Sequence, residues 1–260
     1  MSAIDKKIEL NNRINSELEA MAKTLYDYWF VQFEFPDANG KPYKSSGGKM
    51  AYNEVLKREI PARWRVSQLT QHLNCNEKKL GKKHTFSNIM YLDTSSLTKN
   101  MLDSLQLLTF GTDKIPSRAN MLVGKNDILY STVRPNQCHY GIIKKPVDNM
   151  VASTGYAVFS HKDNIDFNII FYHLITSTDC TEKLVRISET SKSSYPSISP
   201  EDILNLQIAL PEDDELLNSI SAILNPVYDK IAECQQETAN MEALRDWLLP
   251  MLMNGQVTVK

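Results

Sequence analysis

The sequence of 260 residues predicts an α+β fold in which one globular α/β-mixed domain lies between two long helices. Residues 1–30 contain neither Gly nor Pro and are rich in strong helix formers. The last fifty residues have a similar helical pattern. Between the two, short runs of β-branched and aromatic residues alternate with turn residues, which is typical of strands.

The N-terminal segment carries an apolar seam. Its positions recur in alternating steps of three and four, the spacing by which one helix packs along another. The seam consists of Ile4, Ile8, Asn11, Asn15, Leu18, Ala22, Leu25 and Trp29. We therefore expect a long helix that packs along a partner helix.

The C-terminal segment carries the same seam in the same register. Its positions are Leu217, Ile220, Leu224, Val227, Ile231, Cys234, Thr238, Met241, Arg245, Leu248 and Leu252. From Val227 onward they repeat the N-terminal positions at an offset of 223, which indicates an internal repeat and an antiparallel coiled coil of the two helices. Two unrelated amphipathic helices on one core are the alternative interpretation. We expect Pro226 to bend or interrupt the second helix, and Pro250 and Gly255 to mark its end.

These patterns divide the chain into four parts. We expect a helix over 1–34, a linker over 35–56, the globular domain over 57–211 and a second helix over 212–260. Within the domain, strands are expected at 124–133, 141–143, 156–159 and 206–210, and a helix at 167–176. Ser199 followed by Pro200 predicts one more helix start.

Composition restricts the class of protein. No apolar run approaches the ~18–20 residues of a membrane span, and the first residues lack the apolar stretch of a signal peptide. The four cysteines form no C-x-x-C pair, so neither a disulfide framework nor a metal site is indicated. Residues 57–195 carry a net charge of +7 and residues 196–260 a net charge of −8, and such a basic middle suits a polyanion-binding domain. We expect a reduced, cytoplasmic protein that contacts no membrane.

The sequence contains no convincing catalytic motif. Residues 225–228, NPVY, approach the tetrad with which adenine methyltransferases hold a flipped base. Val227 replaces the second proline of that tetrad, however, and lies on the apolar seam, and no glycine-rich cofactor loop follows a strand. The five histidines show no ligand spacing. We therefore expect no catalytic residue in this chain.

The residues that best fit a binding site follow the strand expected at 124–133. Arg134, Asn136 and Gln137 place a guanidinium group and two amides on one loop, beside the rings of His139 and Tyr140. Arg forms paired hydrogen bonds with guanine, and Asn or Gln with adenine, since each matches two neighbouring groups on a base edge. The alternative is that the arginine and the amides only stabilise a turn.

Several segments resemble the specificity subunits of type I restriction-modification systems. Residues 8–12 (IELNN) and 18–33 (LEAMAKTLYDYWFVQF) are similar to the helix between the two halves of those subunits. Residues 129–135 (LYSTVRP), 195–200 (YPSISP) and 244–250 (LRDWLLP) also resemble that family. Together these motifs cover both helices and the middle domain.

The resemblance implies a subunit that recognises DNA and does no chemistry. In that family, two target-recognition domains read the two parts of a split double-stranded DNA site. Antiparallel helices fix their spacing and dock two modification subunits, which carry S-adenosylmethionine and methylate adenine. A restriction subunit with motor activity joins for cleavage, so ATP and Mg are expected on partner subunits and no cofactor in this chain. Because this chain has one such domain, it is either a half-subunit that forms a homodimer or one half of a longer protein.

The resemblance and the residue types together give the candidate residues. The expected DNA-binding residues are Lys78, Lys82, Lys83, Arg118, Ser131, Thr132, Arg134, Asn136, Gln137, His139, Tyr140, Lys192 and Tyr195. The expected subunit-interface residues are Ile4, Ile8, Leu18, Leu25, Trp29, Leu224, Val227, Ile231, Met241 and Leu248. A coiled-coil interaction module with a basic domain that binds nothing specific is the competing interpretation.

Overall fold

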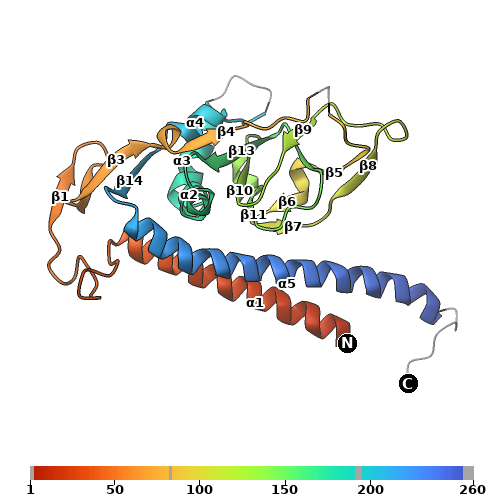
Figure 1. Cartoon of the computed structure of the whole chain (residues 1–260), viewed down its shortest axis with the longest axis horizontal. Coiled ribbons are helices and arrows are strands. Elements are labelled where there is room, and N and C mark those ends of the chain that lie inside the picture. The colour runs from red at the N-terminus through yellow and green to blue at the C-terminus, as the bar shows by residue number, and fades with distance from the viewer. Residues whose placement is uncertain (1–2, 82–83, 191–194, 254–260) are drawn as a thin grey trace.

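The computed structural model describes residues 3–81, 84–190 and 195–253 and has the expected mixed α+β architecture (Figure 1). Two long helices lie side by side along one edge of the molecule, and the strands and shorter helices gather against them. The α-helices are α1 (Ala3–Tyr26), α2 (Asn168–Ile175), α3 (Thr178–Glu189), α4 (Pro200–Leu204) and α5 (Glu215–Met253).

The first helix ends in an unusual way. After α1, the chain forms a π-helical turn, Asp27–Val31, and Phe33 then adopts a left-handed conformation with φ of 62°. The α-helical part is therefore shorter than the expected 1–34, because the backbone widens into the π-helical turn at Asp27 and becomes left-handed at the buried Phe33. The expected linker, 35–56, contains a strand, β1 (Met50–Asn53).

α1 and α5 pack antiparallel. Asp5 pairs with Arg245 at 3.7 Å and Lys7 with Glu237 at 3.1 Å, so rising numbers in α1 meet falling numbers in α5. Asn11 is fully buried on the seam, and its amide nitrogen donates to Glu237 Oε2 at 2.9 Å. A buried polar residue on such a seam favours one register over its alternatives.

The seam is used within a single chain. Ile8, Trp29, Leu224 and Ile231, all expected at a subunit interface, are buried by the opposite helix and by the domain. In this chain these four side chains pack inside one molecule, and their place at a subunit interface stays a prediction. The remaining expected interface residues are half-buried, namely Ile4, Leu18, Leu25, Val227, Met241 and Leu248.

α5 runs through both of its prolines, so the expected interruption at Pro226 is wrong. Its last described residue, Met253, lies between Pro250 and Gly255, the two residues expected to mark its end. Contacts on either side of Pro226 hold the helix in place. Asn225 accepts a hydrogen bond from Lys144 Nζ at 2.8 Å and donates to the Asp166 carbonyl at 3.0 Å. Tyr228 is buried. Tertiary contacts thus offset the one helical hydrogen bond that proline removes. Gly255 lies outside the described residues.

The strands of the described residues form two four-stranded sheets and three two-stranded pairs. The first sheet has the order β11 (Tyr140–Ile143), β10 (Asp127–Ser131), β13 (Tyr156–His161), β4 (Leu73–Cys75). The second has the order β8 (Gln106–Thr109), β5 (Asn88–Leu92), β12 (Met150–Ser153), β9 (Ala119–Leu122), with β5 and β12 parallel. The pairs are β1 with β2 (Arg58–Pro61), β3 (Trp64–Gln68) with β14 (Gln207–Pro211), and β6 (Leu97–Thr98) with β7 (Met101–Leu102).

One hydrophobic core joins the helices to the domain. Tyr26 of α1, Leu224 of α5 and Phe171 of α2 belong to the same buried cluster. The expected helix at 167–176 and the expected strands at 124–133, 141–143, 156–159 and 206–210 are confirmed as α2, β10, β11, β13 and β14. Ser199 caps α4 in a reciprocal arrangement with Asp202, as its position before Pro200 predicts.

Candidate nucleic-acid interface

Two of the sequence motifs lie side by side, although about 60 residues separate them. The Arg134 backbone N–H donates to the Pro196 carbonyl at 2.9 Å, and the Ile198 N–H donates to the Thr132 carbonyl at 2.9 Å. These bonds join residues 132–134 to residues 196–198 as a short antiparallel bridge. They fix the backbone from which Arg134 and Tyr195 project.

The turn after β10 is strained. Arg134 has φ of 49° and Cys138 has φ of 56°, both in the left-handed region. Between them Pro135–Gln137 forms a short 3-10 turn. Non-glycine residues in this region cost about 1 kcal/mol or more, and such strain is concentrated at functional sites. The Arg134 guanidinium lies over the Tyr195 ring, 5.4 Å from its centre, and both side chains are exposed.

These residues border a hollow of about 260 Å³. Five expected DNA-binding residues line it, namely Arg118, Arg134, Gln137, His139 and Tyr195. Five further residues, which the sequence did not indicate, complete it: Asp93, Thr94, Ser95, Val133 and Gly155. The structure thus brings cationic, amide and aromatic groups from three separate parts of the chain to one concave surface. These are the groups that recognise bases and phosphates.

His139 is fixed in orientation. Its Nδ1 lies 3.0 Å from the Leu97 carbonyl and 2.9 Å from Thr98 Oγ1. A carbonyl can only accept, so Nδ1 carries a proton, and in the neutral imidazole Nε2 is then the hydrogen-bond acceptor. Thr132 is held too, because its hydroxyl donates to the Gly155 carbonyl at 3.0 Å.

An ion pair forms the far side of the hollow. Arg118 Nη2 lies 3.2 Å from Asp93 Oδ1. Burial would raise the pKa of Asp93. Hydrogen bonds from Tyr91, the Thr94 backbone and Ser95, together with the Arg118 charge, outweigh that effect and lower it. The carboxylate is therefore charged at neutral pH.

Two expected DNA-binding residues do not reach this surface. Ser131 is 1% exposed, and its hydroxyl donates to the Val133 carbonyl at 2.9 Å, so it closes the turn instead. The Tyr140 ring stacks on Tyr130 at 5.6 Å and meets Tyr172 edge-on at 6.4 Å. Burial raises the pKa of Tyr140 to about 12. The Ser131 side chain therefore belongs to the turn, and its assignment is wrong. Tyr140 is half-buried against the core and does not line the hollow, so its contact with DNA stays a prediction.

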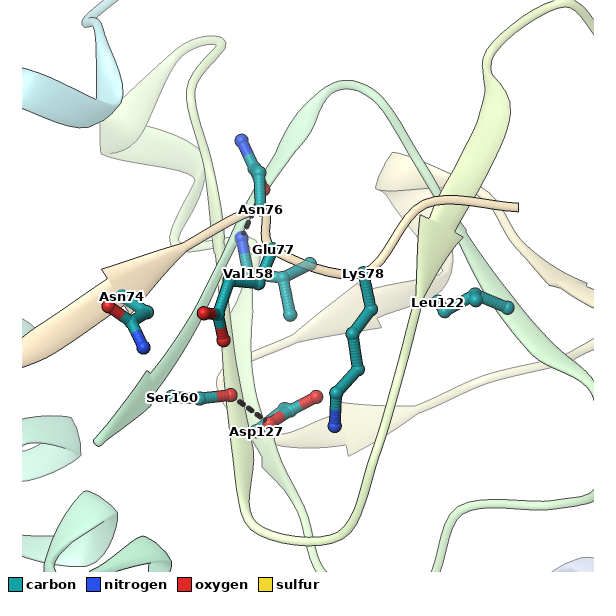
Figure 2. A pocket seen from close by; sticks show the side chains of 8 residues that line it. All are labelled: Asn74, Asn76, Glu77, Lys78, Leu122, Asp127, Val158 and Ser160. Carbon is teal, nitrogen blue, oxygen red and sulfur yellow. Dashed lines mark hydrogen bonds between the residues drawn. The ribbon is translucent and has the colours of Figure 1, made fainter. Parts of the chain in front are cut away.

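The remaining candidates lie elsewhere. Lys78 is exposed and borders a cavity of about 10 Å³, and Figure 2 shows its side chain beside Asp127, which is hydrogen-bonded to Ser160. Asn136 is exposed on the strained turn. Lys82, Lys83 and Lys192 lie outside the described residues.

The described residues contain neither a metal-binding cluster nor a membrane-spanning helix. No group of His, Cys, Asp or Glu side chains within the described ranges is placed to hold a metal ion. No helix in this part of the chain is both long and apolar enough to cross a membrane.

Comparison with known proteins gives a consistent set of relatives, although no family model matches the chain. The HindI specificity subunit of Haemophilus influenzae, a type I restriction enzyme subunit, is 27% identical over 161 residues, which cover 62% of this chain and 34% of the relative. The MjaIX specificity subunit of Methanocaldococcus jannaschii, also from a type I restriction enzyme, is 23% identical over 271 residues, which cover 100% of this chain and 57% of the relative.

Two solved structures share the fold. The HsdS subunit of Thermoanaerobacter tengcongensis has a TM-score of 0.51 and 21% identity, with 74% of this chain and 48% of that chain covered. A chain from a structure of complex assembly and conformational transition in the type I restriction-modification system has a TM-score of 0.52 and 22% identity, with coverage of 75% and 49%. The chain thus spans about half the length of the proteins it matches, and its homologues are the specificity subunits of type I restriction enzymes.

Proposed function

We propose that this chain is a sequence-specific DNA-binding specificity subunit of a type I restriction-modification complex. It does no chemistry itself. It directs adenine methylation and DNA cleavage by partner subunits, which bind S-adenosylmethionine, ATP and Mg. The observation that carries the proposal is the hollow in which Arg134, Gln137, His139, Arg118 and Tyr195 converge.

The geometry of the hollow suits base edges better than it suits phosphates alone. Arg134 presents a planar fork of donors, Gln137 an amide and His139 an acceptor nitrogen. Together these groups can both donate to and accept from bases, as reading in the major groove requires. The net charge of +7 over residues 57–195 supplies the attraction for the DNA backbone, which carries no sequence information by itself.

In this proposal α1 and α5 act as a coiled coil that carries the domain and docks the modification subunits. The proposed assembly is a homodimer. Two copies supply the two reading domains of a split site, and a two-fold axis then requires an inverted repeat in the DNA. Apolar surface that stays exposed on the two helices supports the homodimer, because Met21 of α1 is 54% exposed and Trp247 of α5 is 59% exposed.

Selection from a random pool of duplex DNA tests the proposal. The wild-type protein, with and without the modification subunit, should enrich one motif. Arg134→Ala should cost about 1–3 kcal/mol in binding and relax preference at one base position, because it removes a base contact. Lys78→Ala, the matched control, should weaken all sequences alike and reduce the salt slope by about one, as loss of a phosphate contact does.

The outcomes separate the alternatives. If the wild-type protein enriches no motif, the chain is an interaction module with a basic domain. If Arg134→Ala keeps the wild-type affinity and motif, Arg134 is a turn residue and the reading site lies elsewhere.

A further inference from the structure

Asp93 is the only acidic residue among the described residues that line the hollow. A carboxylate repels phosphates and lowers the general affinity for DNA, so an acidic residue in a DNA-binding hollow must have another role. It follows β5 directly, whereas its partner Arg118 directly precedes β9, and these two strands flank β12 in one sheet.

The Asp93 carboxylate is held on both oxygens. Oδ1 accepts a hydrogen bond from the Tyr91 hydroxyl at 3.0 Å, and Oδ2 accepts one from the Ser95 hydroxyl at 3.3 Å. The backbone beside it is also fixed, because the Tyr156 hydroxyl donates to the Thr94 carbonyl at 2.7 Å. Tyr91 and Tyr156 are both buried, so the support is rigid.

The backbone of Arg118 is fixed, whereas its guanidinium group is exposed. Its carbonyl accepts a hydrogen bond from the Thr154 N–H at 2.8 Å. Its side chain is 60% exposed, while one terminal nitrogen is tied to Asp93. That contact restricts the directions in which the other donors of the guanidinium fork can point. A guanidinium fork matches the two acceptors of guanine, O6 and N7.

We propose that Asp93 and Arg118 form one specificity-determining unit that reads a single guanine. Arg118 touches the base, and Asp93 is the positioning residue that orients it. The inference rests on the proposed function, and it deepens that function by naming a base and the residues that select it. Pairing with Asp93 also partly neutralises Arg118, which weakens its attraction for phosphates and leaves its directional hydrogen bonds in place.

The experiment is the same random-pool selection, carried out on the full chain with Asp93→Asn, Arg118→Ala, Arg118→Lys and the double variant Asp93→Asn with Arg118→Ala. Asp148→Asn is the control, because it removes the same charge from an exposed position outside the hollow. The thermal midpoint of each variant shows whether it folds. Arg118→Lys is informative even if Asp93→Asn unfolds, since Arg118 is exposed and a lysine keeps the charge without the fork.

We expect Asp93→Asn, Arg118→Ala and Arg118→Lys each to reduce the preference for guanine at the same position by about tenfold. The double variant should lose no more of the preference for guanine than Arg118→Ala alone loses, because the two residues act on one contact. All other positions of the motif should stay as in the wild type. The salt dependence of binding should also stay unchanged in Arg118→Lys, which keeps the charge of the pair. Asp148→Asn should change neither the base preferences nor the salt dependence of binding.

Three results would overturn the inference while leaving the proposed function intact. The folded Asp93→Asn protein could retain every base preference, or the Asp93 and Arg118 variants could relax different positions. Arg118→Ala could also weaken all sequences alike and reduce the salt slope by about one, which would make Arg118 a phosphate contact. A wild-type protein that enriches no motif would overturn both proposals at once.

Discussion

Gly155 lies where the hollow has no room for a side chain. A Cβ atom built at this position would be 2.6 Å from Thr94 Oγ1, which is closer than non-bonded atoms approach. Its carbonyl also accepts both the backbone N–H of Thr132, at 2.9 Å, and the Thr132 hydroxyl. Gly155 therefore lets the Asp93 side of the hollow approach the Arg134 side.

Gly155→Ala should push these two sides apart. We expect a loss of about 1–3 kcal/mol in the free energy of unfolding, as for other overpacked sites, and weaker DNA binding. Denaturant unfolding and a binding titration measure the two effects. Adding Thr94→Ala removes the clashing atom and should restore both properties. If Gly155→Ala alone has wild-type stability and affinity, the close approach is not required.

His173 makes the free energy of unfolding depend on pH. It is 6% exposed and stacks on Tyr26, with ring centres 5.2 Å apart. Burial, helped by the charge of Lys23, lowers the pKa of His173 from 6.5 to about 3. Between those values the unfolded chain binds a proton that the folded chain does not. The protein should therefore lose stability as the pH falls below about 6.5, by up to about 1.4 kcal/mol per pH unit.

His173→Phe removes this group and should flatten the pH dependence. Urea unfolding of both proteins from pH 7 to pH 5 measures it, and the comparison isolates His173 because His72 and His161, whose pKa values are also lowered by burial, are present in both. Equal slopes in the two proteins would show that His173 binds its proton equally in the folded and unfolded states, so that burial does not lower its pKa.

At the scale of single residues, the sequence predicts only part of the site. Arg134 and Gln137 follow a recognisable strand and turn, so their exposure on a loop could be foreseen. Asp93 and Gly155 could not, because a carboxylate after one strand and a glycine before another carry no local sign of the hollow that they share. Ser131 was misassigned because the sequence shows a hydroxyl but not the buried turn that uses it.

At the scale of elements, the antiparallel pairing of α1 and α5 decides how the helices can be lengthened. The contacts of Asp5 with Arg245 and of Lys7 with Glu237 place residue 13 opposite residues near 236. Insertions near Glu19 and Glu242, which correspond in the internal repeat, would not lie opposite each other. One heptad inserted after Arg13 and one inserted after Gln236 would lie opposite each other.

This double insertion should keep the seam in register and extend the free end of the helix pair by about 10 Å. The insertions lie beyond the hydrogen bonds by which Asn100 joins the helices to the domain, at Glu19 and Gln235. In the proposed homodimer, the unread spacer of the DNA site should therefore grow by about three base pairs for each helix pair lengthened, with unchanged half-sites.

Methylation mapping in the presence of the modification subunit measures the spacer. The same heptad placed in α1 alone is the control. It breaks the register and should destabilise the protein. Full activity with an unchanged spacer would mean that the helices do not set the distance between the reading domains.

Elements differ in how much of them the sequence reveals. The two long helices have a seam repeated over many turns, which is a strong local signal. α3 was not expected, because its segment is polar and buries only Cys180, Leu184 and Ser188, a narrow stripe with helical spacing. The continuity of α5 through Pro226 could not be foreseen either, since Lys144 and Asp166 hold that turn from elsewhere in the chain.

At the scale of the whole molecule, α5 is longer than its partner. Asp5, near the start of α1, pairs with Arg245, and α5 continues to Met253, about 12 Å further (Figure 1). Trp247 and Leu249 on this overhang are 59% and 47% exposed. Apolar side chains of this size on a helix end are stabilised when a second surface covers them.

We expect the wild-type chain to have the mass of a dimer in sedimentation equilibrium. Trp247→Glu should shift this mass toward that of the monomer, because the dimer would bury the new charge at the overhang. Leu107→Glu is the control, since Leu107 is 60% exposed on β8 of the domain and lies away from the helices. A monomeric mass that neither the modification subunit nor DNA changes would exclude the homodimer.

The domain is closed at its base by the pairing of β3 with β14. Trp64, at its beginning, lies opposite Pro211, at its end, and the five paired positions bring the two ends of a segment of about 150 residues together beside the junction of α1 and α5 (Figure 1). Because the hollow proposed to read DNA combines residues as far apart as Asp93 and Tyr195, no short peptide taken from it would contain the whole site. The whole segment between the two strands can, however, be exchanged as one cassette whose ends already meet, provided that the new segment keeps the residues that pack on α1 and α5. Under the proposed function, a gene that acquires a different cassette through crossovers at these two junctions would address a different DNA sequence, with its helices left as they were.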